Sequence, residues 1–457
     1  MTTTEREAEP GGILSARFRV STVGIVGLVS LVAFQTMAVA TALPTAAREL
    51  DGLAWYGWSF TALLVAGVIS MVAAGELCDR IGSRRPLWAG VLLFLVGLLV
   101  AGVAQSMAVF IAGRALQGFG TGLLGVVLYL IVAEAYPDRL RPPVFGAISA
   151  AWVLPALIGP LVAGWLAEGI GWRWVFLLLV PLVFVGAGML QPTARRLVPP
   201  ADPAPLHPRR WVAALLTAGG IAAAQWAAQE ARAASVPVGL VGLALLVVGL
   251  RELLPPGTAR VRRGVPAVVA LRALLGSPYF AVESLVPLTL TLVHGYSPVA
   301  AGLPLTVGSV GWSVASWWQG RRPDHPRHRF VAAGGALVAV AAAGMAVAAQ
   351  PWAPPWLSYP VWVTGGLGMG LAMSSISVLL LAQSPVADRG ANTSALQVAD
   401  FTSAAVLIGA AGALVAASTR GALSVQAAAG IVNVTMAGVA VLAALLAGRT
   451  QAPPAVR

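Results

Sequence analysis

Long apolar runs separated by short polar segments dominate the chain from residue 20 to residue 447. A run of about 20 apolar residues is long enough for an α-helix to cross ~30 Å of hydrocarbon. The pattern therefore predicts an all-α polytopic membrane protein with fourteen transmembrane spans. The predicted spans are 20–44, 54–76, 86–104, 107–133, 144–168, 172–192, 211–230, 236–254, 273–293, 298–319, 330–349, 355–383, 393–418 and 424–447.

The composition excludes a soluble protein of this length. Hydrophobic residues make up 58% of the 457 residues and charged residues only 10%, against about 25% charged in ordinary globular domains. The mean hydropathy is +0.83. So few charges cannot cover the surface of soluble domains, which excludes a soluble enzyme, a nucleic-acid binder and a disordered scaffold. The single cysteine, Cys78, excludes an intrachain disulfide.

The positive charge of the chain indicates membrane topology rather than nucleic-acid binding. The net charge is +12, but all the basic residues are arginines in small groups between the apolar runs. With the N-terminus inside, 24 of the 29 arginines fall in inner segments and only four in outer segments. Cytoplasmic loops carry such an excess, so both termini are predicted to be cytoplasmic. The absence of lysine and the excess of Ala, Gly and Val suggest a high-GC bacterial source, hence a bacterial plasma membrane.

The prediction that the two middle runs, 211–230 and 236–254, both cross the membrane depends on this charge bias. The run 211–230 contains Gln225, Gln229 and Glu230 and is the weakest of the fourteen. If only one member of the pair crossed, the second half would invert and the arginine bias would collapse. Since 236–254 is too apolar to stay outside lipid, we expect both runs to cross.

An internal repeat divides the chain. At an offset of 250 residues, Asp138-Arg139 matches Asp388-Arg389, 157–159 matches 407–409, and Gly118 and Gly120 match Gly368 and Gly370. Transporters are often built from such repeats, with the substrate site at their interface. The predicted organisation is a disordered cytoplasmic tail 1–16, a six-helix bundle 17–194, a Pro/Arg linker 195–210, an inserted two-helix hairpin 211–254, a six-helix bundle 255–450 and a tail 451–457.

The polar loop after the second span carries a recognisable pattern. Residues 75–85 read GELCDRIGSRR, which resembles the G-x-L-a-D-R-x-G-R-[RK] loop of the major facilitator superfamily. Gly75 would let two helices approach, and Gly82 would permit a tight turn. Asp79 would lie at the positive end of a neighbouring helix, and the arginines would pair with acids such as Glu134. The arginines of this loop are Arg80, Arg84 and Arg85. The alternative is a topology-setting turn, and the equivalent second-half loop, 316–322, keeps the arginine but lacks the acid.

The fourth span contains an arginine. The stretch RALQGFGTG at 114–122 is similar to the R-x-x-x-Q-G-x-G pattern in span four of the same superfamily. A charge within a span is expensive, by ~2.5–3.5 kcal/mol on insertion scales, so Arg114 should face the interior with a partner. The resemblance assigns Arg114, beside Gln117, to proton relay or helix coupling, whereas the alternative is snorkelling to the outer surface. By the 250-residue offset its repeat partner is Thr364.

The fifth span resembles the antiporter signature of the superfamily, G-x8-G-x3-G-P-x2-G-G. Here Pro155 and Ala163 replace two of the glycines, while the rest of the pattern is kept. Small residues allow close helix packing, and proline bends a helix. The resemblance implies an exporter, and the alternative is a generic glycine-packed helix. The matching positions are Gly146, Gly159, Pro160 and Gly164.

Two acids lie where lipid should exclude them. Glu283 is central in the run 273–293, where a carboxyl could bind and release a proton during alternating access. Asp400, in the inner half of span thirteen, is the second candidate, and for both the alternative is a structural hydrogen bond between helices. Many fourteen-span exporters carry an acid where this chain has Gln35, so Glu283 would carry more of the proton coupling. Tyr129 could line a cavity for aromatic or cationic substrates.

These features together resemble the fourteen-span drug:proton antiporter branch of the superfamily. The resemblance implies two six-helix halves that rock around a central cavity and export small amphipathic molecules in exchange for protons. A dedicated exporter of one lipid or secreted metabolite is the alternative. An enzyme is disfavoured because no clustered catalytic or metal-binding set is apparent. We expect no cofactor, metal or nucleic acid, and a monomer whose partners are the substrate, protons and membrane lipids.

Overall fold

The computed structural model describes residues 12–199, 207–322, 324–385 and 388–452, and every regular element in these stretches is helical. Fourteen helical segments are long and apolar enough to cross a membrane. The prediction of an all-α protein with fourteen spans is therefore confirmed. Most of the two predicted tails and residues 200–206 of the predicted Pro/Arg linker lie outside the described residues.

The first six spans are built from eight helices, because two spans are interrupted. The predicted span 144–168 consists of α5 and α6, separated at residues 151–152. Pro155 explains the break, since its ring displaces the carbonyl of Ala151 and it has no N–H to donate. The helices are α1 (Arg19–Glu49), α2 (Trp58–Ile81), α3 (Arg84–Gly102), α4 (Met107–Ala135), α5 (Arg141–Ala150), α6 (Val153–Gly169), α7 (Trp174–Leu177) and α8 (Leu179–Ala194).

The last six spans are single helices, and the first of them is longer than predicted. The helix α11 begins at Val265 rather than at 273. Arg272 therefore lies within a span and not in a loop. The helices are α11 (Val265–His294), α12 (Pro298–Gly320), α13 (Arg327–Ala348), α14 (Ser358–Gln383), α15 (Arg389–Thr419) and α16 (Val425–Leu446).

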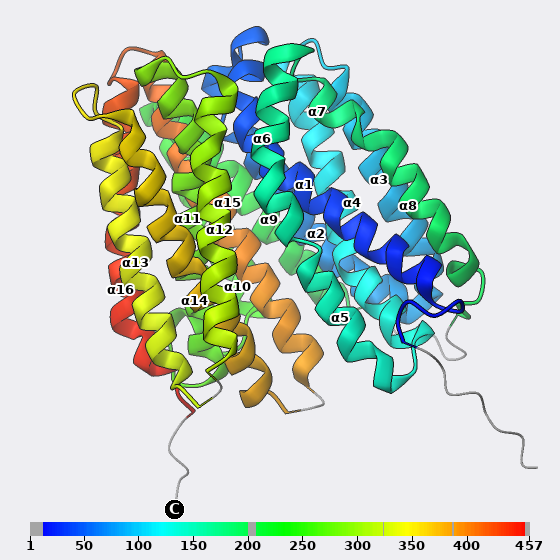
Figure 1. The fold of residues 1–457 in the computed structure, drawn as a ribbon. Helices are drawn as coiled ribbons and strands as arrows, with labels where there is room; N and C mark the ends of the chain where they lie inside the picture. Colours follow the sequence, from blue (N-terminus) through cyan, green and yellow to red (C-terminus); the bar gives the residue numbers. More distant parts are fainter. Residues whose placement is uncertain (1–11, 200–206, 323, 386–387, 453–457) are drawn as a thin grey trace, which may run out of the picture.

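The helices form two groups side by side, the first from α1 to α8 and the second from α11 to α16 (Figure 1). The groups meet where α2 packs on α15, where α6 packs on α12 and where α1 packs on α11. Both ends of the described chain lie at one end of the molecule, which we call the terminus side, and the opposite end is the far side (Figure 1). Which side faces the cytoplasm stays a prediction from the arginines.

The two middle spans form a hairpin of α9 (Pro208–Glu230) and α10 (Val236–Leu253). The helix α9 packs along the seam between α2 and α15, with Ile221 and Ala405 in a small apolar cluster there. At the terminus side, the indole N–H of Trp211 donates to the carboxylate of Glu76 in α2 over 2.5 Å. At the far side, Gln229 bonds to the segment that leads into α2. The polar residues that weakened the prediction of this span therefore serve helix–helix contacts.

Gln229 connects three parts of the chain at the far end of α9. Its side-chain oxygen accepts from the indole N–H of Trp58, and its amide donates to the carbonyl of Ala54 over 2.6 Å. The guanidinium of Arg420, at the end of α15, donates to its backbone carbonyl over 2.6 Å. The helix α9 thus contacts α15 at mid-helix and at the far side. It forms hydrogen bonds with α2 at both ends of that helix.

Glycines set the closest helix approaches and test the predicted repeat pairing. A Cβ at Gly118 in α4 would lie 2.2 Å from a carbonyl of α2, and one at Gly120 would lie 2.5 Å from the backbone of α3. In the second half, Gly368 in α14 meets α13 and Gly370 meets α12. The predicted pairing of 118 with 368 and 120 with 370 is therefore wrong in this helix, because the paired glycines face different neighbouring helices.

Candidate functional site

A small central pocket lies between the two helix groups. It is lined by Thr36, Met37 and Ala40 of α1, Phe60 of α2, and Phe280, Glu283 and Ser284 of α11. Its volume of about 60 Å³ admits water but is far below the ~300–1,000 Å³ of sites for drug-sized ligands. In this conformation the pocket is therefore contracted around the Glu283 carboxyl.

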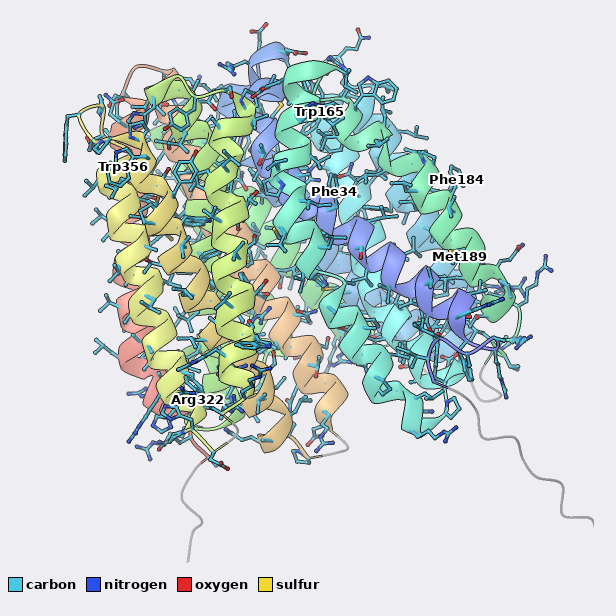
Figure 2. The ribbon with its side chains drawn as sticks, in the orientation of Figure 1. Phe34, Trp165, Phe184, Met189, Arg322 and Trp356 are labelled. Carbon is cyan, nitrogen blue, oxygen red and sulfur yellow. The ribbon has the colours of Figure 1, made fainter. Side chains whose placement is uncertain are left out.

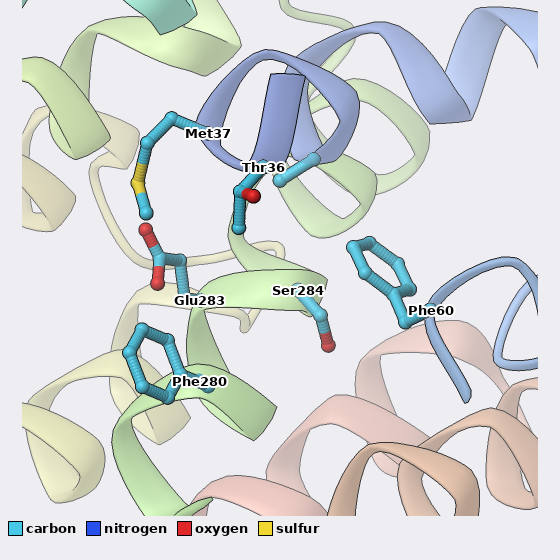
Figure 3. Close-up of a pocket in the computed structure, with 7 residues that line it drawn as sticks. Thr36, Met37, Phe60, Phe280, Glu283 and Ser284 are labelled. Atoms are coloured by element: carbon cyan, nitrogen blue, oxygen red, sulfur yellow. The ribbon is translucent and has the colours of Figure 1, made fainter. Parts of the chain in front are cut away.

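Glu283 carries the chemistry of this pocket. Its carboxylate points toward the end of the Met37 side chain, with the Phe280 ring beside it (Figure 3). Within the described residues it forms neither a hydrogen bond nor an ion pair. Pro287 lies four residues further along α11 and has no N–H to bond the Glu283 carbonyl. The helix therefore lacks a backbone hydrogen bond at the position of the acid. The spacing of Glu283 and Pro287 indicates this in the sequence alone.

Arg114, Gln117 and Gln35 come together as a buried polar cluster between α1 and α4. Arg114 is only 2% exposed. It donates to the Gln117 side-chain oxygen over 2.6 Å and to the backbone carbonyl of Ser59 over 2.9 Å. The same Gln117 oxygen accepts from the Gln35 amide over 2.8 Å. The arginine thus faces the interior rather than the outer surface, and its described hydrogen-bond partners are all uncharged.

The matching helix of the second half lacks the arginine. The predicted repeat partner of Arg114, Thr364, bonds only to the backbone of its own helix. Trp362, two residues earlier in α14, is buried and stacks on Tyr279 of α11, with ring centroids 4.7 Å apart. Because α14 contains no arginine, the conclusion that the charge belongs to the first half alone is unchanged.

Asp400 is held in an ion pair that the sequence did not reveal. Its carboxylate accepts from the Arg272 guanidinium over 2.8 Å, across α15 and α11. Both side chains are largely buried. Asp400 therefore differs from Glu283, which has no ion-pair partner in the described structure.

The loop 75–85 forms the tight turn that was expected, but not the expected contacts. Gly82 ends α2 with a φ of +76°, a conformation suited to glycine. A Cβ at Gly75 would meet nothing within 4 Å, so the expectation of a close helix approach there is wrong. Glu134 accepts from the Ser83 hydroxyl over 2.5 Å rather than from an arginine. Ser83 is a buried residue of the turn, whereas the four charged residues of the loop other than Glu76 are exposed. These exposed residues are Asp79, Arg80, Arg84 and Arg85.

The span that resembles the antiporter signature packs across the two groups. A Cβ at Gly164 in α6 would lie 2.7 Å from the Val299 Cα of α12, and Gly159 faces Met37 of α1. The carbonyl of Pro160 lies against Gly302 of α12. Gly146, by contrast, meets nothing within 4 Å. The close packing is therefore concentrated in the far-side part of this span.

Tyr129 does not reach the central pocket. It is 48% exposed and stacks on Phe145 of α5, with ring centroids 5.3 Å apart. Its helix, α4, is correctly predicted, but the face on which a side chain lies depends on the rotation of the helix in the bundle. The pocket instead uses Phe60 and Phe280, which the sequence did not single out.

The two groups are fastened to one another at the far side. The Tyr56 hydroxyl donates to the Ser284 carbonyl over 2.7 Å, and the Glu168 carboxylate accepts from the Val299 amide over 2.6 Å. In the described part of the chain, all side-chain hydrogen bonds between the two groups come from the far-side halves of their helices. The conformation is therefore closed at the far side.

Comparisons with known proteins agree with this architecture. The family model of the Major Facilitator Superfamily matches residues 25–407. An MFS-type transporter of Mycobacterium tuberculosis, itself described as uncharacterised, is 31% identical over 86% of this chain. The chain spans 59% of the length of that relative. A probable multidrug-efflux transporter of the same organism is 27% identical and covers 94% of this chain and 97% of its own.

Solved structures show the same fold at low sequence identity. A POT family transporter superposes with a TM-score of 0.69 at 15% identity, covering 94% of this chain and 97% of its own. A D-xylose–proton symporter superposes with a TM-score of 0.68 at 14% identity, with the same coverage. The helical architecture, the paired helix groups and the family match lead to one conclusion: the chain belongs to the major facilitator superfamily.

Proposed function

We propose that the chain is a proton-coupled secondary transporter that exports small amphipathic molecules by alternating access. The observation that carries the proposal is the Glu283 carboxyl. It lies in a pocket between the two helix groups and has no hydrogen-bond or ion-pair partner among the described residues. An acid in this position can exchange its proton with either side as the groups rock. The multidrug-efflux relative supports the direction of transport.

The pocket chemistry favours cationic or neutral amphipathic substrates. A carboxylate attracts a cation, and the rings of Phe60 and Phe280 with the thioether of Met37 provide apolar and polarisable walls. Protonation of Glu283 removes the charge that would hold a cation. Proton and substrate therefore compete for one group, which is the requirement for exchange.

The contracted pocket corresponds to one stage of the proposed cycle. Closure at the far side, through Tyr56 and Glu168, leaves access from the terminus side. Expansion of the pocket would accompany substrate entry from there. A membrane potential of 100 mV contributes ~2.3 kcal/mol for each proton that moves inward.

The topology of the proposal follows from the arginines. Both termini are cytoplasmic, the membrane is a bacterial plasma membrane, and the transporter works as a monomer without cofactor or metal. The tails and linker connect a first bundle, the inserted hairpin and a second bundle in the predicted order. Cysteine residues introduced near each terminus of Cys78→Ala protein should react with membrane-impermeant maleimides only after the cells are opened.

The central test is transport in Glu283→Gln, which keeps the size of the side chain and removes its proton chemistry. Purified protein in proteoliposomes, given an imposed pH gradient, should lose gradient-driven accumulation of substrate. The matched control is Glu252→Gln, an acid in the last turn of α10, far from the pocket. Full proton-driven transport by the Glu283 variant would contradict the proposed mechanism.

The substrate class requires a compound panel in the same assay. The proposal predicts transport of several chemically unrelated amphipathic cations. Activity with a single lipid or secreted metabolite, and with nothing else, would replace multidrug export by dedicated export. The role of Glu283 would then still be decided by its own variant.

A further inference from the structure

The segment that joins α12 to α13 is strongly basic and has no role in the proposed transport cycle. Residues 321–329 contain four arginines and one aspartate, a net charge of +3. Trp317 and Trp318 precede them in the last turn of α12. The stretch 316–322 corresponds to the 75–85 loop in the second half but has no counterpart of Asp79.

Two arginines of this segment are stacked on the two tryptophans. The Arg321 Cζ lies 3.6 Å from the ring centroid of Trp317, and the Arg322 Cζ lies 3.9 Å from that of Trp318. The indoles are 58% and 40% exposed. We call these four residues the Trp–Arg clasp. A guanidinium stacked face-on keeps its N–H edges free for bidentate binding of a phosphate.

The donors of the clasp are not used by the protein. In the described part of the chain, neither the Arg321 nor the Arg322 guanidinium bonds to a protein oxygen. Both line an open hollow of about 380 Å³, together with Asp324 and His325. Even with the negative charge of Asp324, the net charge of the residues that line the hollow is positive. The hollow is large enough for a small polar headgroup.

The location of the clasp matches the depth of lipid phosphates. The span of α12 ends at Gly320, and Arg322 lies at the terminus side of the molecule (Figure 2). Tryptophan rings prefer the membrane–water interface, and basic pockets just beyond a span bind anionic lipid headgroups. Exposed indoles would lie along the first carbons of a lipid chain, which a soluble phosphate does not need.

We propose that the Trp–Arg clasp binds the phosphate of an anionic phospholipid. The guanidiniums of Arg321 and Arg322 hold the phosphate oxygens, and the indoles of Trp317 and Trp318 fix the guanidinium planes and contact the glycerol and upper acyl region. This inference is independent of the transported substrate, because its site lies at the lipid-facing end of α12 and not in the central pocket.

Native mass spectrometry of the full chain in detergent, titrated with phosphatidylglycerol, tests the proposal. The double variant Arg321→Gln/Arg322→Gln should bind the tightest phosphatidylglycerol about tenfold or more weakly. The matched control is Arg209→Gln/Arg210→Gln, a pair of exposed arginines at the start of α9 on the same side. It removes the same charge without removing a stack, and should change the affinity less than twofold.

The variant Trp317→Leu/Trp318→Leu separates stacking from charge, because it keeps both arginines. It should weaken phosphatidylglycerol binding severalfold, while phosphatidylcholine binds weakly to all forms. Equal losses in the α9 control would overturn the proposal in favour of a general charge effect. Displacement of the lipid by an equal concentration of inorganic phosphate would overturn it in favour of a soluble-anion site. Melting temperatures close to that of the parent protein would show that the variants are folded.

Discussion

Replacing Tyr56 with phenylalanine removes one hydrogen bond that fastens the two helix groups at the far side. The hydroxyl of this buried tyrosine donates to the carbonyl of Ser284, next to Glu283. The ring remains, so packing is preserved. The substitution therefore changes one polar contact that exists only while the far side is closed.

The magnitude follows from this single bond. A hydrogen bond contributes about 0.5–1.5 kcal/mol net in proteins, and an average near ~0.6 kcal/mol has been found between membrane helices. A loss of ~1 kcal/mol from the far-side-closed state raises the far-side-open to far-side-closed ratio about fivefold. The pocket chemistry is unaltered, so substrate affinity within each state should not change.

Distances between spin labels across the far side provide the assay. Labels at Ile170→Cys and Trp356→Cys, both exposed at the far side, report the separation of the two groups in Cys78→Ala protein. Pulsed electron paramagnetic resonance should show a larger long-distance population in Tyr56→Phe.

The matched control is Tyr136→Phe, which removes a buried hydrogen bond to Thr22 of 2.9 Å within the first group. Burial raises the pKa of the Tyr136 phenol, so the control hydroxyl stays protonated through neutral pH. It should lower stability without moving the label distances. Identical distance distributions in the two variants would refute the reasoning.

Three further predictions follow from other contacts. Gly118→Ala should lower the melting temperature, since overpacking costs ~1–3 kcal/mol, whereas Gly125→Ala in the same helix, with open space at its Cβ, should not. Asp400→Asn should destabilise by ~3–5 kcal/mol because it leaves Arg272 buried without its partner, and unchanged thermal unfolding would argue against the ion pair. Asp79→Asn, at an exposed loop position, should slow transport while binding of substrate in detergent stays near that of the parent; equal loss of binding would contradict this.

The sequence was sufficient for the number of spans and for their helical type. Hydropathy and arginine placement depend on local composition, so they also identified the weak span that became α9. Glu283 could be singled out because a charge in a long apolar run is conspicuous by itself. The missing backbone hydrogen bond at the Glu283 carbonyl also follows from the sequence, because Pro287 lies four residues later.

Other features depend on how helices rotate and dock, which local patterns do not encode. The partner of Asp400 was hidden because α11 begins before its apolar run, so Arg272 resembled a loop residue. The repeat pairing in α14 was wrong because glycines recur there at short spacings, and only their contacts with α12 and α13 reveal the mismatch. The exposed position of Tyr129 and the open space at Gly75 also depend on helix rotation and docking.

The far end of α9 joins the two helix groups indirectly. Gln229 accepts from the indole of Trp58 in the first group, and its backbone carbonyl accepts from Arg420 in the second group. The inserted hairpin therefore adds a bridge between the groups at the side where their direct hydrogen bonds also lie. Without the Arg420 guanidinium, the far end of α9 would keep its hydrogen bonds to the first group alone.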